Sequence, residues 1–254
     1  MKISYELNPP KIVKGERFDL AQLNDDMRSM ADRASQLSGL VSGIHLTDSV
    51  LGIPRVSSVT AAGYIKERVG DCTLSCSIRV RDRNFTSLCQ AVSDAIMIGV
   101  DSLLVLMGDD PAEGPRDSGL RPSAAVKMLR KEGYNSNIKL DLSFPAKLND
   151  RNSKSVQSKL DAKPHTLVTQ SISSLSDLGE IVDLAKHHEI KVAAVVMVPA
   201  EKNRHSASLI GLDWSEYEKH PADFVRQVDK IADRVLLTSP NSFASGLELL
   251  KQLK

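Results

Sequence analysis

The sequence has few aromatic residues and almost no net charge. Aromatic side chains make up 4% of its 254 residues, and 33 basic residues nearly balance 32 acidic ones. A net charge of +1 provides no excess of basic surface that would attract nucleic acid or an acidic membrane. We therefore expect neither of these partners.

Long apolar runs and a secretion signal are also missing. No run approaches the roughly 20 apolar residues that span a bilayer, and the N-terminal segment MKISYELNPP lacks an apolar signal-peptide core. These features predict a cytoplasmic protein without a membrane segment. The three cysteines form no CxxC pair, and they are interpreted either as small buried apolar residues in a reducing compartment or as a zinc or redox site.

Several common catalytic and cofactor motifs are absent as well. No GxGxxG turn follows the first apolar run, and no GxSxG or P-loop motif occurs. The six histidines show no HxxxH or comparable spacing, so we expect no metal site. The missing glycine-rich turn argues against an open dinucleotide-binding sheet, which is the main structural alternative.

The chain does contain a regular alternation of short β-branched runs and longer segments with helical spacing of apolar residues. Parallel strands need crossover helices and two covered faces. Eight such units in this length predict one domain over residues 1–254, a single (β/α)8 barrel. The predicted strands are Lys2–Leu7, Leu40–His45, Thr73–Val80, Ser102–Met107, Ile138–Leu142, Thr166–Thr169, Lys191–Val198 and Arg234–Leu237.

Chemistry in such a barrel collects where the strands end, and the first predicted strand ends in a carboxylate. Glu6 is followed by Pro9 and Pro10, which stiffen the exit of the strand. One interpretation is a general acid whose pKa is raised by partial burial. The other is a glutamate that pairs with Lys11 or another base.

Later strand ends also carry polar or aromatic residues. The fourth strand runs into Gly108 and Asp109, which either allow close approach of a ligand and accept its hydrogen bond or form a tight turn. Gln170 ends the sixth strand as a ligand contact or a buried hydrogen-bonding group. Phe144 ends the fifth strand and would either stack on a planar ring or close the core. Asn84 is a good N-cap for the helix after the third strand.

Taken in order, these strand ends resemble the methylenetetrahydrofolate reductase family. Ser4–Lys11 looks like that family's opening S-F-E-F-F-P-P-[RK], and Val80–Asn84 looks like its C-R-D-R-N. Leu103–Pro111 is similar to its L-x-L-x-G-D-x-P, and Val168–Gln170 is similar to its I-T-Q. The matches run in register over nearly the whole chain, and the first and third are the most specific.

The resemblance implies a barrel with bound FAD and an NAD(P)H donor that reduces a methylene-tetrahydropterin to the methyl form. By position, Glu6 would protonate the bridging amine of the pterin, and Asp109 and Gln170 would hold the pterin. The positions that match flavin contacts are Gly108, Asp109, Phe144 and Lys159.

Several flavin-side positions depart from the family pattern, so the substrate half of the site matches better than the cofactor half. The family's H-L-T-C is Ser77–Val80 here, and Met107 stands where an arginine precedes Gly-Asp. Two alternatives follow: a flavin-free pterin-binding methyl-transfer protein, and a non-catalytic subunit of a one-carbon or redox complex. As partners we expect further copies of the chain or a redox subunit.

Overall fold

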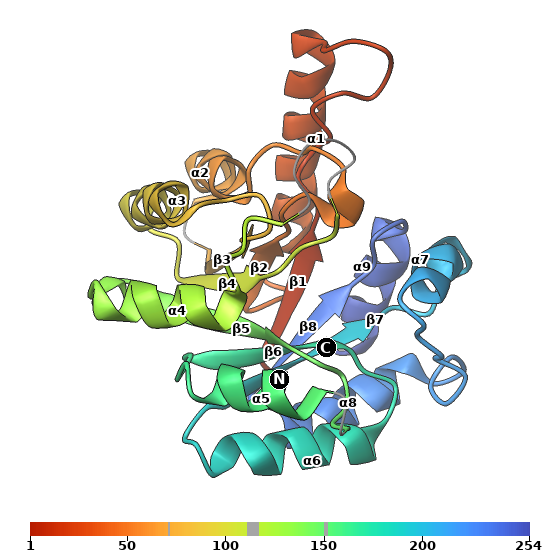
Figure 1. The fold of residues 1–254 in the computed structure, drawn as a ribbon. Helices are drawn as coiled ribbons and strands as arrows, with labels where there is room; N and C mark the ends of the chain where they lie inside the picture. Colours follow the sequence, from red (N-terminus) through yellow and green to blue (C-terminus); the bar gives the residue numbers. More distant parts are fainter. Residues whose placement is uncertain (71, 111–116, 150–151) are drawn as a thin grey trace.

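The computed structural model describes residues 1–70, 72–110, 117–149 and 152–254. Pro111, the last residue of the fourth-strand block, therefore lies outside the described residues. Eight parallel strands close into one barrel in chain order (Figure 1), which confirms the predicted (β/α)8 barrel. The strands are β1 (Ile3–Leu7), β2 (Gly43–Leu46), β3 (Leu74–Arg79), β4 (Ser102–Leu106), β5 (Lys139–Phe144), β6 (Thr166–Ser171), β7 (Lys191–Met197) and β8 (Arg234–Thr238).

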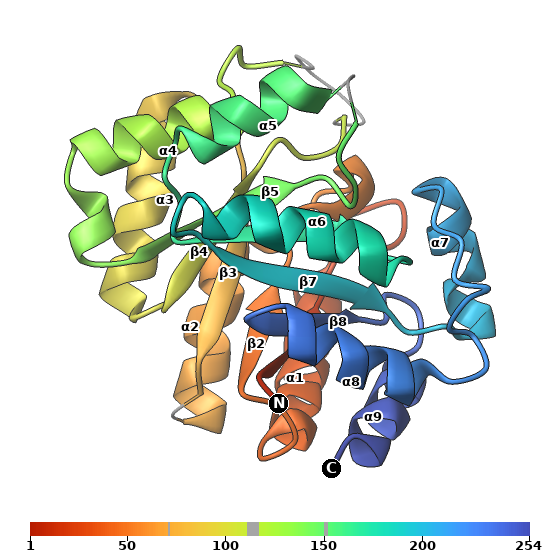
Figure 2. The ribbon, with the colours of Figure 1, turned by 90° about the horizontal axis from the view of Figure 1, so that it is seen from below.

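Helices surround the barrel and connect successive strands (Figure 2). In the described part of the chain, none is both long and apolar enough to cross a membrane. The α-helices are α1 (Leu20–Leu37), α2 (Ser58–Val69), α3 (Phe85–Ile98), α4 (Pro122–Lys131), α5 (Ser153–Leu160), α6 (Leu175–Lys186), α7 (Arg204–Leu209), α8 (Pro221–Ile231) and α9 (Phe243–Gln252). The short 3-10 turns are η1 (Val50–Gly52), η2 (Tyr134–Ser136) and η4 (Glu201–Asn203).

Local capping chemistry explains where several helices begin. The Asp19 carboxylate accepts hydrogen bonds from two backbone N–H groups of the first turn of α1, which would otherwise have no partner. The Asn84 side chain accepts from Ser87 N at 2.9 Å, so its predicted role as the N-cap of α3 is confirmed. Pro122 opens α4, where a missing N–H costs nothing.

The second strand differs most from its prediction, because two apolar residues belong to the turn before it. The backbone N–H groups of Leu40 and Val41 both donate to the Leu37 carbonyl, at 2.9 Å and 3.2 Å. The pair therefore closes the end of α1, and β2 begins later, at Gly43. His45 consequently lies inside the strand instead of ending it.

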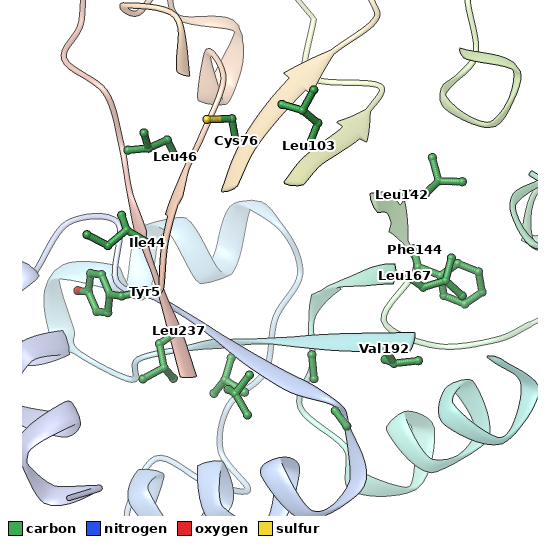
Figure 3. Packing of buried hydrophobic residues seen from close by; sticks show 14 of the residues in the cluster. Tyr5, Ile44, Leu46, Cys76, Leu103, Leu142, Phe144, Leu167, Val192 and Leu237 are labelled. Carbon is green, nitrogen blue, oxygen red and sulfur yellow. The ribbon is translucent and has the colours of Figure 1, made fainter. Parts of the chain in front are cut away.

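The main core lies between the barrel wall and the helices. Side chains at alternate positions of each strand point outward into this layer, as expected for a two-residue period. Figure 3 shows Leu46, Cys76, Leu103 and Leu142 there, and all four are fully buried. Because side chains alternate along a strand, the residues between these outward-facing positions point into the barrel interior.

The barrel interior is unusually polar in its lower half. His45 lies between two serines, with 2.8 Å from Nδ1 to Ser75 Oγ and 2.8 Å from Nε2 to Ser77 Oγ. In the same part of the interior, Asp141 is 2% exposed and lies 3.7 Å from the Arg234 guanidinium, and both charges act on His45. A small apolar cluster also faces the interior, formed by Leu104, Val168, Ala193, Val195 and Leu236.

Two helical glycines allow a matched test of the packing. A Cβ added to Gly246 in α9 would lie 2.7 Å from ring carbons of the buried Tyr5, whereas one added to Gly179 in α6 would meet nothing within 4 Å. We expect Gly246→Ala to lower the free energy of unfolding by about 1–3 kcal/mol through overpacking. Gly179→Ala should raise it by about 0.5–1 kcal/mol because alanine favours a helix. Urea unfolding followed by circular dichroism measures both, and equal effects of the two changes would contradict this packing.

Candidate active site

The strand register brings a carboxylate and two hydroxyl groups to one level of the barrel. Because the strands tilt, alternate strands contribute the side chains of one layer. The register places Glu6, Ser77, Ser143 and Val195 in such a layer, toward the C-terminal ends of the strands. Glu6 and Ser143 are partly exposed there, whereas Ser77 is buried. This layer forms the floor of the barrel mouth.

Glu6 is held by its neighbour on the closing strand. The Thr238 hydroxyl donates to Glu6 Oε1 at 2.7 Å. Burial raises the pKa of Glu6 above its ordinary value, and the hydrogen bond from Thr238 opposes this only in part. Lys11, the base that the sequence offered as a partner, instead faces Arg55 across an isolated antiparallel bridge. Glu6 therefore keeps its proton to a higher pH than a solvated glutamate does.

His45 lies below this layer and was missed by the sequence analysis. Burial lowers the pKa of His45 to about 3, with a further contribution from the Arg234 charge, so the imidazole is neutral near pH 7. Its hydrogen bond to Ser77 holds that hydroxyl in the same layer as Glu6. The signal in the sequence was the two-residue spacing of polar groups in β2 and β3, which indicates an inward-facing polar row.

An ion network encloses one side of the mouth. Asp48 accepts from Arg79 N at 3.1 Å and from Arg83 Nη2 at 3.3 Å. The Arg79 side chain is 2% exposed, and its guanidinium contacts Asp82 at 3.1 Å. Gly108 has a φ of +84°, and a Cβ there would lie 2.8 Å from Arg79 Cβ. Glycine is therefore needed at position 108 because the Arg79 side chain packs closely against its backbone.

Asp109 and Gln170 both lie at the rim of the mouth and are exposed. Asp109 Oδ2 accepts from Leu51 N at 2.7 Å. Leu51 and Ser49 have positive φ values of 59° and 44°, a conformation that non-glycine residues rarely adopt. Asp109 thus holds a strained turn of the β2–α2 loop in place, and Gln170 is the exposed residue near the end of β6.

Phe144 and Lys159 meet outside the barrel wall. Phe144 is 1% exposed and belongs to the layer between the strands and the helices. Lys159 of α5 places its Nζ 6.0 Å from the centre of that ring, and burial lowers the pKa of the amine. The structure therefore brings these two residues together but separates them from Glu6, Asp109 and Gln170.

The strands offer no amine to the mouth. Within the eight strands, lysine occurs only as the first residue of β5 and of β7, Lys139 and Lys191, at the opposite end of the barrel. Among the described residues, no group of three or more His, Cys, Asp or Glu side chains is placed to hold a metal ion. The described mouth therefore offers a carboxyl with hydroxyl groups in the same layer, beside the ion network of Asp48, Arg79 and Arg83.

Comparison with solved structures gives several (β/α)8 barrels of low sequence identity. The chain is similar to the aldolase QR15, with 11% identity, a TM-score of 0.58, and 99% of this chain and 93% of that one covered. It is also similar to a tetrameric deoxyribose phosphate aldolase from Aeropyrum pernix, with 16% identity and a TM-score of 0.59. The match covers 100% of this chain and 91% of that one. A third similar structure is a mutant tryptophan synthase α-subunit from Pyrococcus furiosus, with 12% identity and a TM-score of 0.58. Here the match covers 99% of this chain and 96% of that one. At these identities the likeness shows the fold alone.

No protein-family model and no curated protein sequence matches the chain. The predicted membership of the methylenetetrahydrofolate reductase family is therefore wrong, since the similar structures are aldolases and a tryptophan synthase α-subunit. The activity of a flavoprotein oxidoreductase on a methylene-tetrahydropterin is wrong with it, and neither alternative has support. Each matched block is short and lies at a strand exit, where an apolar run gives way to polar residues in this class of barrel. Neither the structure nor the comparisons test whether FAD is bound or whether NAD(P)H is the electron donor, so both stay predictions.

The raised pKa of Glu6 has a consequence for stability. A carboxyl whose pKa rises on folding contributes fully below its unfolded pKa, near 4.5, and this contribution is lost as pH rises through the folded value. Glu6→Gln should therefore raise the free energy of unfolding at pH 8 by on the order of 1 kcal/mol and change it little at pH 4. Urea unfolding at both pH values tests this, with Glu180→Gln on the exposed surface of α6 as control. A stabilisation of equal size at both pH values would contradict the assignment.

Proposed function

We propose that the protein is a lyase that cleaves or forms a carbon–carbon bond next to a carbonyl group by acid–base catalysis. The observation that carries the proposal is Glu6, a partly buried carboxyl with a raised pKa on the floor of the barrel mouth. A raised pKa makes the carboxyl a better proton acceptor once it is ionised, which suits a group that both accepts and donates a proton. The fold, which the chain has in common with aldolases, supports this class of reaction.

The proposed substrate is a β-hydroxy carbonyl compound. Ionised Glu6 removes the proton of the β-hydroxyl group, the bond between the α and β carbons breaks, and its electrons form an enolate. An aldehyde leaves, and the protonated Glu6 returns its proton to the enolate carbon, so that no net proton is consumed. The Ser143 hydroxyl and the Gln170 amide, which reach the mouth from β5 and β6, donate hydrogen bonds to the enolate oxygen.

The same reaction through an imine would need a lysine beside the substrate. The strands carry lysine only at their N-terminal ends, at Lys139 and Lys191. Enolate stabilisation by neutral donors is therefore the mode that the strand residues support.

A panel of small β-hydroxy ketones and aldehydes, with and without a phosphate ester, tests the activity in the cleavage direction. Glu6→Gln should lower kcat by roughly 100- to 10,000-fold, while Lys147→Gln, in the exposed β5–α5 loop, should not change it. Treatment with borohydride during turnover should leave no reduced adduct on the protein by mass spectrometry. A trapped lysine adduct, or full activity of Glu6→Gln, would overturn the mechanism.

Self-association is the second part of the proposal. The deoxyribose phosphate aldolase of similar fold is described as tetrameric, and here Met97 of α3 is 86% exposed beside a cavity of about 350 Å³ between α2 and α3. Met97→Lys should shift the protein toward the monomer in sedimentation velocity, and Met128→Lys on α4 should not. Sedimentation of the parent as a monomer at all concentrations would contradict this part.

A further inference from the structure

Two loops at the C-terminal face of the barrel are joined into a short ribbon. Lys11, in the loop after β1, and Arg55, in the loop after β2, face each other in an antiparallel bridge. Backbone hydrogen bonds flank them, from Ile12 N to the Pro54 carbonyl at 3.1 Å and from Val56 N to the Pro10 carbonyl at 2.9 Å. The ribbon lies on the same face as Glu6, because both loops follow the C-terminal ends of their strands.

The ribbon places two positive charges opposite each other. Opposite residues of an antiparallel pair have their Cβ atoms about 5 Å apart on one face, and like charges there are destabilising. In the described part of the chain, neither Lys11 nor Arg55 lies within ion-pair distance of a carboxylate. A negatively charged ligand would remove this repulsion.

Arg55 is also incompletely satisfied. Its Nη1 donates to the Pro9 carbonyl at 2.7 Å, but its Nε is buried without a hydrogen-bond partner. Burial lowers the pKa of Arg55, which reflects the cost of removing the cation from water. A guanidinium held in one orientation with a free buried N–H is suited to a planar, two-point contact with an oxyanion.

A cavity of about 300 Å³ lies beside the ribbon and is lined by Lys11, Lys14, Arg17, Asp19 and Asp26, among others. The carboxylates that line it are already engaged. Asp26 pairs with Lys14 at 2.6 Å, and Asp19 caps the first turn of α1. Glu16 is the further acidic residue of this loop, and it is exposed. Lys11 and Arg17 are therefore the cations at this cavity without a carboxylate partner among the described residues.

We infer that Lys11, Arg17 and Arg55 bind the phosphate group of a small phosphate ester whose carbonyl end lies at Glu6. A phosphate dianion offers enough acceptor oxygens for all three side chains and compensates the opposed charges of the ribbon. This inference rests on the proposed lyase function for the carbonyl end, whereas the phosphate contacts rest on the ribbon and the cavity beside it.

Isothermal titration calorimetry of the full chain with inorganic phosphate tests the site directly. Lys11→Gln and Arg55→Gln should each weaken phosphate binding at least tenfold. Lys147→Gln, a change of exposed charge on the same face of the barrel, should leave the Kd unchanged. Equal phosphate affinity in all three variants, or no binding by the parent, would overturn the inference.

Two further measurements separate the outcomes. Without phosphate, Lys11→Gln should melt at the same temperature as the parent or higher, because it removes a repulsion, so lost binding cannot come from unfolding. Glu6→Gln should bind phosphate as tightly as the parent, which keeps this readout independent of the lyase proposal. Acetate that competes as well as phosphate would show a site for any anion and would overturn the phosphate assignment.

Discussion

The closure of the last strand onto the first is the constraint on which the candidate site depends. Strands β1 and β8 are paired in parallel although almost the whole chain separates them, and this pairing brings the Thr238 hydroxyl to the Glu6 carboxylate. A barrel without an edge has no freedom to slip its register by a residue, because every inward side chain would turn outward. The position and the pKa of Glu6 are therefore consequences of closure, not of the segment around Glu6 alone.

The polar barrel interior shows how the fold tolerates such a group. A buried polar group without a partner is costly, and the interior meets this demand by pairing neutral groups, as in the hydrogen bonds of His45 to Ser75 and Ser77. Glu6 is one exception, since one hydroxyl donor only partly offsets its burial, and Asp141, whose buried Oδ1 has no hydrogen-bond partner, is another. A site that keeps an incompletely compensated carboxyl reduces stability at neutral pH and gains a group able to exchange protons.

The sequence predicted the fold well because the fold follows from periodic patterns. All eight strands overlap the runs from which they were predicted, and the error at Leu40 and Val41 occurred where an apolar pair closes a helix instead of starting a strand. The family assignment failed because its evidence was confined to short strand exits. The partners of Glu6 and Asp109 were not predictable either, since Thr238 and Leu51 are 232 and 58 residues away along the chain.

The segment between Glu6 and Lys11 links the two ends of the proposed site. Five Cα–Cα steps lead from Glu6 to Lys11, so the backbone spans at most roughly 17 Å when fully extended. Pro9 and Pro10 remove much of its freedom. Arg55 holds the Pro9 carbonyl and fixes the segment from the other side. The separation between the proton-exchanging carboxyl and the opposed cations is therefore set by the protein before any ligand arrives. A rigid spacing of this kind selects ligands by length, since a longer or shorter compound reaches only one end, and it makes the two prolines part of the recognition although neither side chain carries a polar group.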